Sequence, residues 1–319
     1  MSAAKFLRFL LAVAVSAGFL WLLLRGVDGG ELVAIVSGAS WSWLLAALLA
    51  LSLGYALRIA RWQSLLSKEN PRILWRQCAG PLLAGFAMNN VLPFRAGDAM
   101  RCVGFGSQLG VSGGGAMATL FVERLLDALM LLAALGLALL LFGIDGQRFF
   151  AVGGAALAAL AVLLVLLLMF PTTLVFLLGR LSLFFGWLVP KWAGRLREEL
   201  EKARIVLEAN ARGNTLTPLL GWSLLVWAAE GMVFYSVARA LLALESPLAA
   251  WLALPVATLA TLLPGTPGYI GTFDFFAAEA MTAAGNAAVA ATAYALLVHL
   301  WLWLPVTLAG GLWLWGRRS

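Results

Sequence analysis

The stretch GGGAMATLFVERLLDALMLLAALGLALLLFG (Gly113–Gly143) contains an apolar run longer than the about 20 residues that an α-helix needs to cross a bilayer. A second run of this kind covers Phe149–Phe170. Hydrophobic residues make up 63% of the 319-residue chain and charged residues 12%, against the roughly 25% charged residues of soluble domains. The short alternating segments of a membrane β-barrel are not seen. The sequence therefore predicts an all-α, polytopic integral membrane protein that forms one transmembrane domain over residues 1–319.

Basic residues predict the orientation of the chain. Five arginines and lysines fall in Arg58–Gln77, and others cluster near residues 191–212 and 317–318. The positive-inside rule places such clusters in the cytoplasm. All of these clusters lie in the cytoplasm if each of the stretches 78–111 and 248–284 enters and leaves the membrane on the same side. The chain then has six full spans. We therefore expect a multi-pass protein of the bacterial inner membrane, with both termini and the interfacial helices at 178–213 in the cytoplasm.

The net charge of +7 also raises the question of nucleic-acid binding. The basic residues lie at the ends of apolar runs, which is typical of membrane topology. We therefore predict no nucleic-acid partner.

Two broken apolar segments share one pattern, in which an apolar half is followed by Leu-Pro, then glycine, then an acidic residue. They are VLPFRAGD (Val91–Asp98) and LLPGTPGYIGTFD (Leu262–Asp274). Paired Pro/Gly interruptions in corresponding positions are typical of inverted repeats in transporters, so we predict two re-entrant elements of opposite orientation. The alternative is a kink and a loop in each of two ordinary helices. The residues expected to break the backbone are Pro93, Gly97, Pro264, Gly265, Pro267, Gly268 and Gly271.

The first broken segment carries charges at helical spacing. Arg95, Asp98 and Arg101 are three residues apart and leave a net positive site. Guanidinium groups bind phosphate oxygens in a forked geometry, so an anionic lipid headgroup is the expected ligand. The alternative is an interfacial loop whose arginines reach toward water. The predicted substrate-binding residues are Asn89, Asn90, Arg95, Asp98, Arg101 and Tyr269.

Carboxylates also lie inside predicted spans. Glu123 and Asp127 are four residues apart in FVERLLDALM, where a charge costs several kcal/mol unless it is paired. We expect a supporting charge network with partners among the arginines of this region. Its predicted members are Arg58, Arg61, Glu123, Arg124 and Asp127, with Arg95 or Arg101 as further partners.

Glu230 lies near the centre of a span without a cation within one helical turn. It is expected either to titrate with a proton or to pair with a distant arginine. Asp274, beside the second broken segment, is the other candidate for proton coupling. His299, the sole histidine, is expected to be a hydrogen-bonded core residue. The two cysteines and this histidine show no metal-ligand spacing, and no phosphate-binding loop is found, so we predict no metal and no cofactor.

The order of four motifs resembles that of the lysylphosphatidylglycerol synthase transmembrane-domain family. These motifs are YALRIARWQSLL (Tyr55–Leu66), NNVLPFRAGDAMR (Asn89–Arg101), FVERLLDALMLL (Phe121–Leu132) and LLPGTPGYIGTFD (Leu262–Asp274). The resemblance covers nearly the whole chain and implies lipid translocation between leaflets without an ATPase. Full-length synthases of the family add a soluble aminoacyl-transferase domain. We find no such domain in these residues and expect no synthase activity.

The expected function is therefore that of a flippase or transporter for a phospholipid or a related anionic or aminoacylated lipid, and not that of an enzyme. Two alternatives remain. In the first, the chain is an integral-membrane enzyme acting on lipid phosphates or polyprenyl-linked substrates. In the second, it is the membrane partner of a separate lipid-modifying enzyme. Membrane lipids are the expected partners, and the sequence leaves the oligomeric state open.

Overall fold

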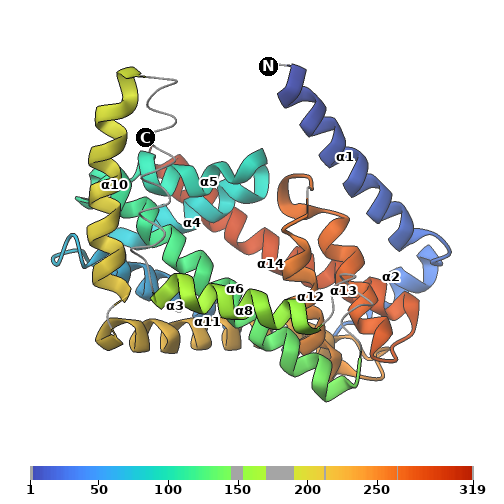
Figure 1. Ribbon diagram of the computed structural model, residues 1–319. Helices are drawn as coiled ribbons and strands as arrows, with labels where there is room; N and C mark the ends of the chain where they lie inside the picture. Colours follow the sequence, from blue (N-terminus) through green and yellow to red (C-terminus); the bar gives the residue numbers. More distant parts are fainter. Residues whose placement is uncertain (1–2, 145–153, 170–189, 212, 264, 318–319) are drawn as a thin grey trace.

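The computed structural model describes residues 3–144, 154–169, 190–211, 213–263 and 265–317. These residues form helices joined by short loops, and no strand occurs among them, so the predicted all-α fold is confirmed (Figure 1). Four helices are long and apolar enough to cross a membrane. They are α3 (Trp41–Leu66), α6 (Gly113–Phe142), α11 (Gly213–Ala240) and α14 (Ala288–Gly316).

The other elements are shorter or carry a break. In chain order they are α1 (Ala3–Leu24), α2 (Gly29–Ser37), α4 (Trp75–Val91), η1 (Pro93–Arg95), α5 (Ala96–Ala99), η2 (Met100–Gly104), η3 (Ser107–Leu109), α8 (Gly154–Met169), α10 (Pro190–Ala211), η4 (Pro247–Ala249), α12 (Ala250–Ala260), η5 (Pro267–Tyr269) and α13 (Thr272–Ala283).

The predicted number of six full spans stays a prediction. The segment predicted as Phe149–Phe170 lies partly outside the described residues, as does the predicted interfacial segment 178–213, of which α10 forms the described part. Helix α3 includes Arg58 and Arg61, which belong to the basic cluster predicted to lie in the cytoplasm. Both side chains are buried against other helices, where each pairs with a carboxylate.

Helices α3 and α11 pack side by side in antiparallel orientation. The amide of Ser40, just before α3, donates to the carbonyl of Ala240, the last residue of α11. Further along, Arg61 of α3 bonds to Ser223 of α11. Because α4 follows the end of α3 and α12 follows the end of α11, the two broken segments start at opposite ends of this pair (Figure 1).

Each broken segment folds back on itself as a helical hairpin. In the first hairpin α4 packs against α5 and η2, and in the second α12 packs against α13. The wider packing follows the same pattern in both halves, since α4 packs on α14 and α12 packs on α6. The first hairpin thus contacts the helix that follows the second hairpin, and the reverse also holds. Such an exchange is compatible with the predicted inverted repeat.

Glycine permits the tight return in both hairpins. A Cβ placed on Gly97 would lie 1.8 Å from the carbonyl oxygen of Gly85, so α5 can approach α4 only without a side chain there. Gly271 precedes α13 with a φ of +87°, and a Cβ there would lie 2.2 Å from the carbonyl oxygen of Ser16. Two of the predicted backbone breaks are therefore sites of close backbone approach. Pro264, another predicted break, lies outside the described residues.

Small residues fill the main core, where α12, α13 and α14 meet α11. Alanine lets helix backbones approach closely, and this packing is the main source of stability inside a bilayer, where lipid and side chains are equally apolar. The fully buried alanines of this core include Ala250, Ala253, Ala257, Ala277, Ala280, Ala291, Ala293 and Ala295.

Candidate functional site

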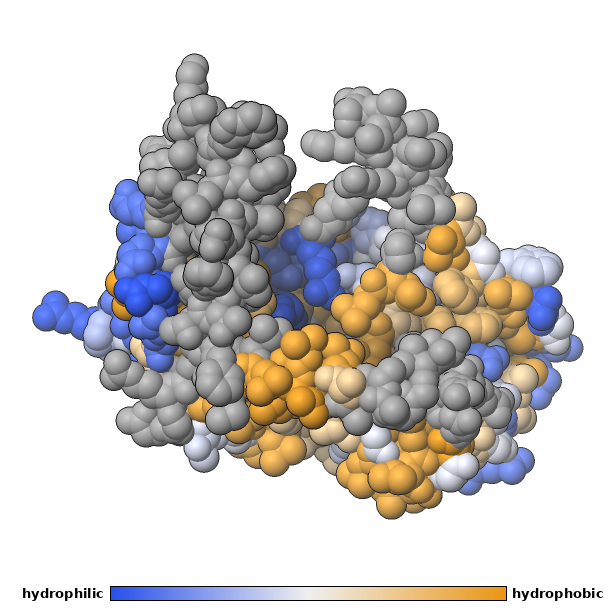
Figure 2. Space-filling view, viewed as in Figure 1, coloured by the Kyte–Doolittle hydropathy of each residue, from blue (hydrophilic) through white to orange (hydrophobic). Residues whose placement is uncertain are grey.

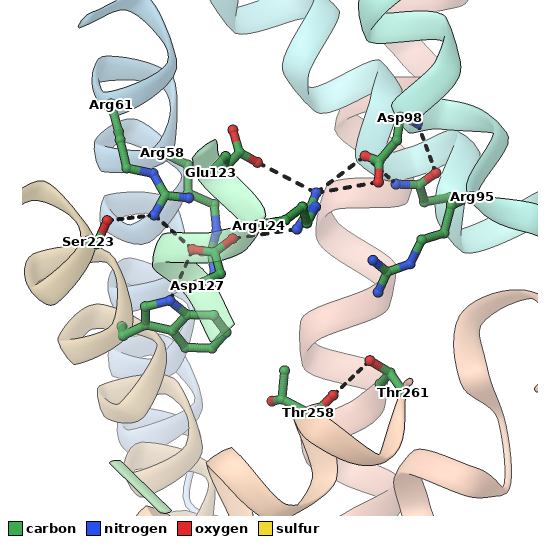
Figure 3. Close-up of polar contacts among 12 residues, drawn as sticks. Arg58, Arg61, Arg95, Asp98, Glu123, Arg124, Asp127, Ser223, Thr258 and Thr261 are labelled. Carbon is green, nitrogen blue, oxygen red and sulfur yellow. Dashed lines mark hydrogen bonds and ion pairs between the residues drawn. The ribbon is translucent and has the colours of Figure 1, made fainter. Parts of the chain in front are cut away.

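Buried charges from four elements meet beside the first hairpin (Figure 3). The most enclosed contact joins Arg101 of η2 to Glu123 of α6 through two hydrogen bonds of 3.0 and 2.9 Å. The side chains are 1% and 3% exposed, and the guanidinium also lies 4.4 Å from the ring centroid of Trp62. The predicted headgroup ligand Arg101 is thus engaged by a carboxylate from another helix.

Asp127, one turn after Glu123, binds groups from both α3 and α11. Its Oδ1 accepts a hydrogen bond from Arg61 at 2.7 Å and another from the indole of Trp227 at 3.1 Å. Arg61 also donates to the hydroxyl of Ser223 at 2.9 Å. The pairing of Arg61 with Asp127 was among the partners expected from the sequence. Ser223 and Trp227 carried no charge signal in the sequence and were not predicted.

Arg124 lies between three carboxylates. Its nitrogens approach Asp98 at 3.3 Å, Glu123 at 3.5 Å and Asp127 at 3.4 Å. Asp98 is held in turn by the side-chain amide of Asn89 at 3.0 Å, and its own backbone N–H donates back to Asn89. The Arg124 side chain is still 33% exposed, so it can meet a ligand from the open side.

Glu230 pairs with Arg58 at 3.1 Å, from α11 to α3. This matches the second of the two expected roles, a partner for a distant arginine. The contact crosses between helices that are antiparallel, so neighbours on the two helices lie far apart in the sequence.

The tips of the two hairpins meet. The Nε of Arg95, in the first tip, donates to the hydroxyl of Tyr269, in the second, at 2.8 Å. These are the two non-glycine residues in the described part of the chain with a positive φ, of +51° and +58°. Such backbone conformations are strained for residues with a side chain and are found mainly at functional sites. The strained residues of both hairpins therefore contact each other.

Asn90 fixes the first tip to α14. Its side-chain amide donates to the hydroxyl of Thr307 at 2.8 Å, and its carbonyl accepts from the indole of Trp303 at 3.3 Å. Gly268 of the second tip lies close to the backbone carbonyl of Asn90. A Cβ on Gly268 would be 3.2 Å from this oxygen. The side-chain NH2 group and the backbone carbonyl of Asn90 are thus engaged within the protein.

Arg95 faces an open region. Figure 3 shows its guanidinium directed away from Asp98, toward the end of α12 that carries Thr258 and Thr261. The described part of the chain offers Arg95 no carboxylate within ion-pair distance. Figure 2 shows a hollow in this face, with hydrophilic atoms at its centre and hydrophobic surface below them.

A second polar cluster ties α13 to α14. The Nδ1 of His299 lies 2.8 Å from Asp274, and its Nε2 lies 2.8 Å from the carbonyl oxygen of Gly268. The other oxygen of Asp274 accepts from the amide of Gly271 at 2.8 Å. His299 is therefore a hydrogen-bonded residue, as expected, but its pairing with Asp274 was not foreseen.

The described residues hold no group of three histidine, cysteine or acidic side chains placed to bind a metal. Both cysteines, Cys78 and Cys102, are buried and free. The site can thus offer charged and hydrogen-bonding side chains to a ligand, and Arg95 and Arg124 are its more exposed cations.

A helical membrane protein with two opposed hairpins that meet beside a buried charge network is the class that this architecture defines. The family model described as Lysylphosphatidylglycerol synthase TM region matches residues 9–310, and the chain belongs to this family. The resemblance expected from the motifs is confirmed, and the family suggests a membrane protein related to lipid modification or flipping. A comparison with curated proteins found no match.

Proposed function

We propose that the protein moves lipids between the leaflets of the bacterial inner membrane and that the headgroup passes between the two hairpin tips. The two hairpins are taken to be re-entrant, the first from the cytoplasm and the second from outside. A helix break inside hydrocarbon persists only where its free backbone groups are buried or line a polar cavity. The meeting of both breaks at one place supports such a cavity.

The observation that carries the proposal is the uncompensated charge at the tips. Arg58, Arg61, Arg101 and Arg124 each pair with a carboxylate, and the four carboxylates involved are Asp98, Glu123, Asp127 and Glu230. Arg95 is the fifth arginine of this region, so five cations face four anions. A lipid phosphate is the natural partner for the remaining charge, since arginine binds phosphate oxygens through paired N–H groups.

The paired arginines have a supporting role in this proposal. Arg101 and Arg61 hold α6 in place against η2 and α3, and Asp98 positions Arg124. Arg95 and Arg124 then contact the headgroup, and Arg95 exchanges its bond to Tyr269 for one to the lipid phosphate. Transport runs down the lipid gradient or uses an ion gradient, and no lipid bond is broken.

The test is lipid flipping in proteoliposomes, using fluorescent phosphatidylglycerol and a membrane-impermeant quencher. We expect fast flipping by the wild type and a loss of at least tenfold in Arg95→Ala and Asp98→Asn. Arg72→Ala is the matched control, because Arg72 is exposed in the loop before α4 and lies outside the network. All variants are compared at equal protein density and after confirming equal thermal stability.

Wild-type flipping rates in both Arg95→Ala and Asp98→Asn would contradict the assigned headgroup site. If the wild type flips no lipid, the same vesicles are incubated with magnesium and analysed for consumption of lipid phosphate. Consumption would favour the membrane enzyme, and co-purification of a lipid-modifying enzyme would favour the role of a synthase partner.

A further inference from the structure

The His299–Asp274 pair lies outside the charge network and contacts the second hairpin at its break. His299 comes from α14, Asp274 from α13 and the Gly268 carbonyl from η5, so three elements meet at one imidazole. Gly268 has a φ of +71° and directly precedes Tyr269, which holds Arg95 of the other hairpin. Gly268 and Tyr269 therefore connect the imidazole of His299 to the contact between the two tips.

Both ring nitrogens of His299 face oxygen atoms at hydrogen-bond distance. A nitrogen that faces a carbonyl oxygen must carry a proton to bond with it, and the contact between Nδ1 and the carboxyl of Asp274 also needs a proton. The pair satisfies both contacts only when it holds two protons in total. Removing one leaves a nitrogen lone pair facing an oxygen lone pair, at either the carboxylate or the Gly268 carbonyl.

The imidazole lies at the edge of an open groove. A groove of about 260 Å³ opens over the pair and is lined by Ile270, Asp274, Leu296, His299, Leu300 and Trp303. The side chain of His299 is 13% exposed and that of Asp274 is 2% exposed, so the imidazole is the partner that meets the groove. The ring of Phe273 covers another side of the imidazole, with centroids 4.8 Å apart.

The groups that face the pair from the packed elements are otherwise uncharged. They are the Gly268 carbonyl from η5, the Phe273 ring and the Gly271 amide from the α13 side, and the apolar residues of the groove. Tyr269, the neighbouring titratable residue, points to Arg95. Protonation of His299 is thus not opposed by a nearby cation in the described part of the chain.

We propose that the His299–Asp274 pair is a proton-binding site that locks the second hairpin tip. With the second proton bound, Nε2 donates to the Gly268 carbonyl and keeps Tyr269 against Arg95. When that proton leaves, the bond to Gly268 is lost, Tyr269 leaves its strained conformation and the tips separate. The effect on transport rests on the proposed lipid flipping, and separation of the tips is the step that admits the headgroup.

The first measurement reads the lock without transport. His299 is the sole histidine and Tyr269 is one of four tyrosines, so labelling both residue types gives a simple NMR spectrum of the protein in nanodiscs. A tag without histidine is used, and Tyr269→Phe assigns the tyrosine signal. From roughly pH 5 to 9, we expect both ring nitrogens to be protonated at the acid end and one to lose its proton with rising pH.

The Tyr269 signal should move with the same midpoint as His299 in the wild type and stay fixed in His299→Gln, which cannot titrate. In Asp274→Asn, which removes the charge of the partner, the midpoint of His299 should shift. A His299 that keeps one protonation state throughout, or a Tyr269 signal that does not follow it, would overturn the proposal.

The second measurement is the pH profile of flipping in the vesicles described above. We expect the wild-type rate to rise severalfold as the pH rises through the NMR midpoint, and His299→Gln to flip at a rate that does not depend on pH. A wild-type rate independent of pH would overturn the lock and leave flipping itself intact. Absence of flipping would refute the proposed function, and the NMR measurement would still decide the proton site.

Discussion

Glu123→Gln is expected to destabilise the protein strongly. The substitution keeps the shape of the side chain but removes the charge opposite Arg101, which is 1% exposed and bonded to Glu123 through both terminal nitrogens. Removal of one partner from a buried ion pair costs about 3–5 kcal/mol, because the remaining charge stays buried without compensation. For a chain of this size, a loss of that magnitude corresponds to a drop in Tm on the order of 10 °C.

Thermal unfolding with a thiol-reactive dye measures this effect directly. Cys78 and Cys102 are both free and buried, so the dye reports the loss of tertiary structure around the pair. Arg101→Met should be destabilising in the same way, since it keeps the aliphatic stem beside Gly85 but leaves Glu123 unpaired. Arg204→Met, at an exposed residue of α10, serves as a control that should barely change Tm.

The double variant Arg101→Met with Glu123→Leu tests the cause. An apolar pair of similar volume often replaces a buried ion pair at little cost, so the double variant should be more stable than either single variant. If Glu123→Gln melted within about 2 °C of the wild type, a shift expected from less than about 1 kcal/mol, the pair would not be buried as described.

Two further predictions concern packing and pH. Gly97→Ala should abolish correct folding, because its Cβ would lie 1.8 Å from a backbone oxygen. Gly136→Ala is the control and should fold normally, because Gly136 of α6 has open space around it. Size-exclusion profiles of both variants measure the outcome. The hydrogen bond from Lys202 lowers the pKa of Glu199 from its ordinary 4.5, so the stability that Glu199 contributes is present above that pH and lost as the pH falls below it. Between pH 6 and pH 3 the Tm of Glu199→Gln should therefore fall less steeply than that of the wild type. Equal slopes of Tm against pH in both proteins would refute this.

The features predicted most closely from the sequence were those with local physical causes. The long apolar run Gly113–Gly143 indicated α6 to within a few residues, since span length follows from bilayer thickness. Leu-Pro followed by glycine indicated both breaks, because proline and glycine together disfavour a continued helix. Single prolines do not have this effect here, since Pro81 and Pro255 lie inside α4 and α12. The burial of Arg58 and Arg61 depends on contacts with α11 and α6 and not on the α3 sequence.

Partners between distant helices were harder to predict. The spacing of Glu123 and Asp127 placed both on one face of a helix, but the sequence left several arginines as partners for each. Antiparallel packing of α3 against α11 pairs Arg58 with Glu230, and the contact of α3 with α6 pairs Arg61 with Asp127. The contact of Arg95 with Tyr269 depends on two hairpins meeting tip to tip, which no local pattern encodes.

In the proposed topology the first hairpin enters and leaves the membrane on the cytoplasmic side, and the second enters and leaves on the outer side. Single cysteines at four exposed positions test it in a background that lacks Cys78 and Cys102, using membrane-impermeant thiol reagents on intact cells and on inverted vesicles. The positions flank the hairpins and are Arg72, Ser107, Glu245 and Ala287. We predict that positions 72 and 107 label only from the cytoplasm and positions 245 and 287 only from outside. Labelling of 72 and 107 from opposite sides would contradict the re-entrant arrangement and the passage of headgroups between the tips.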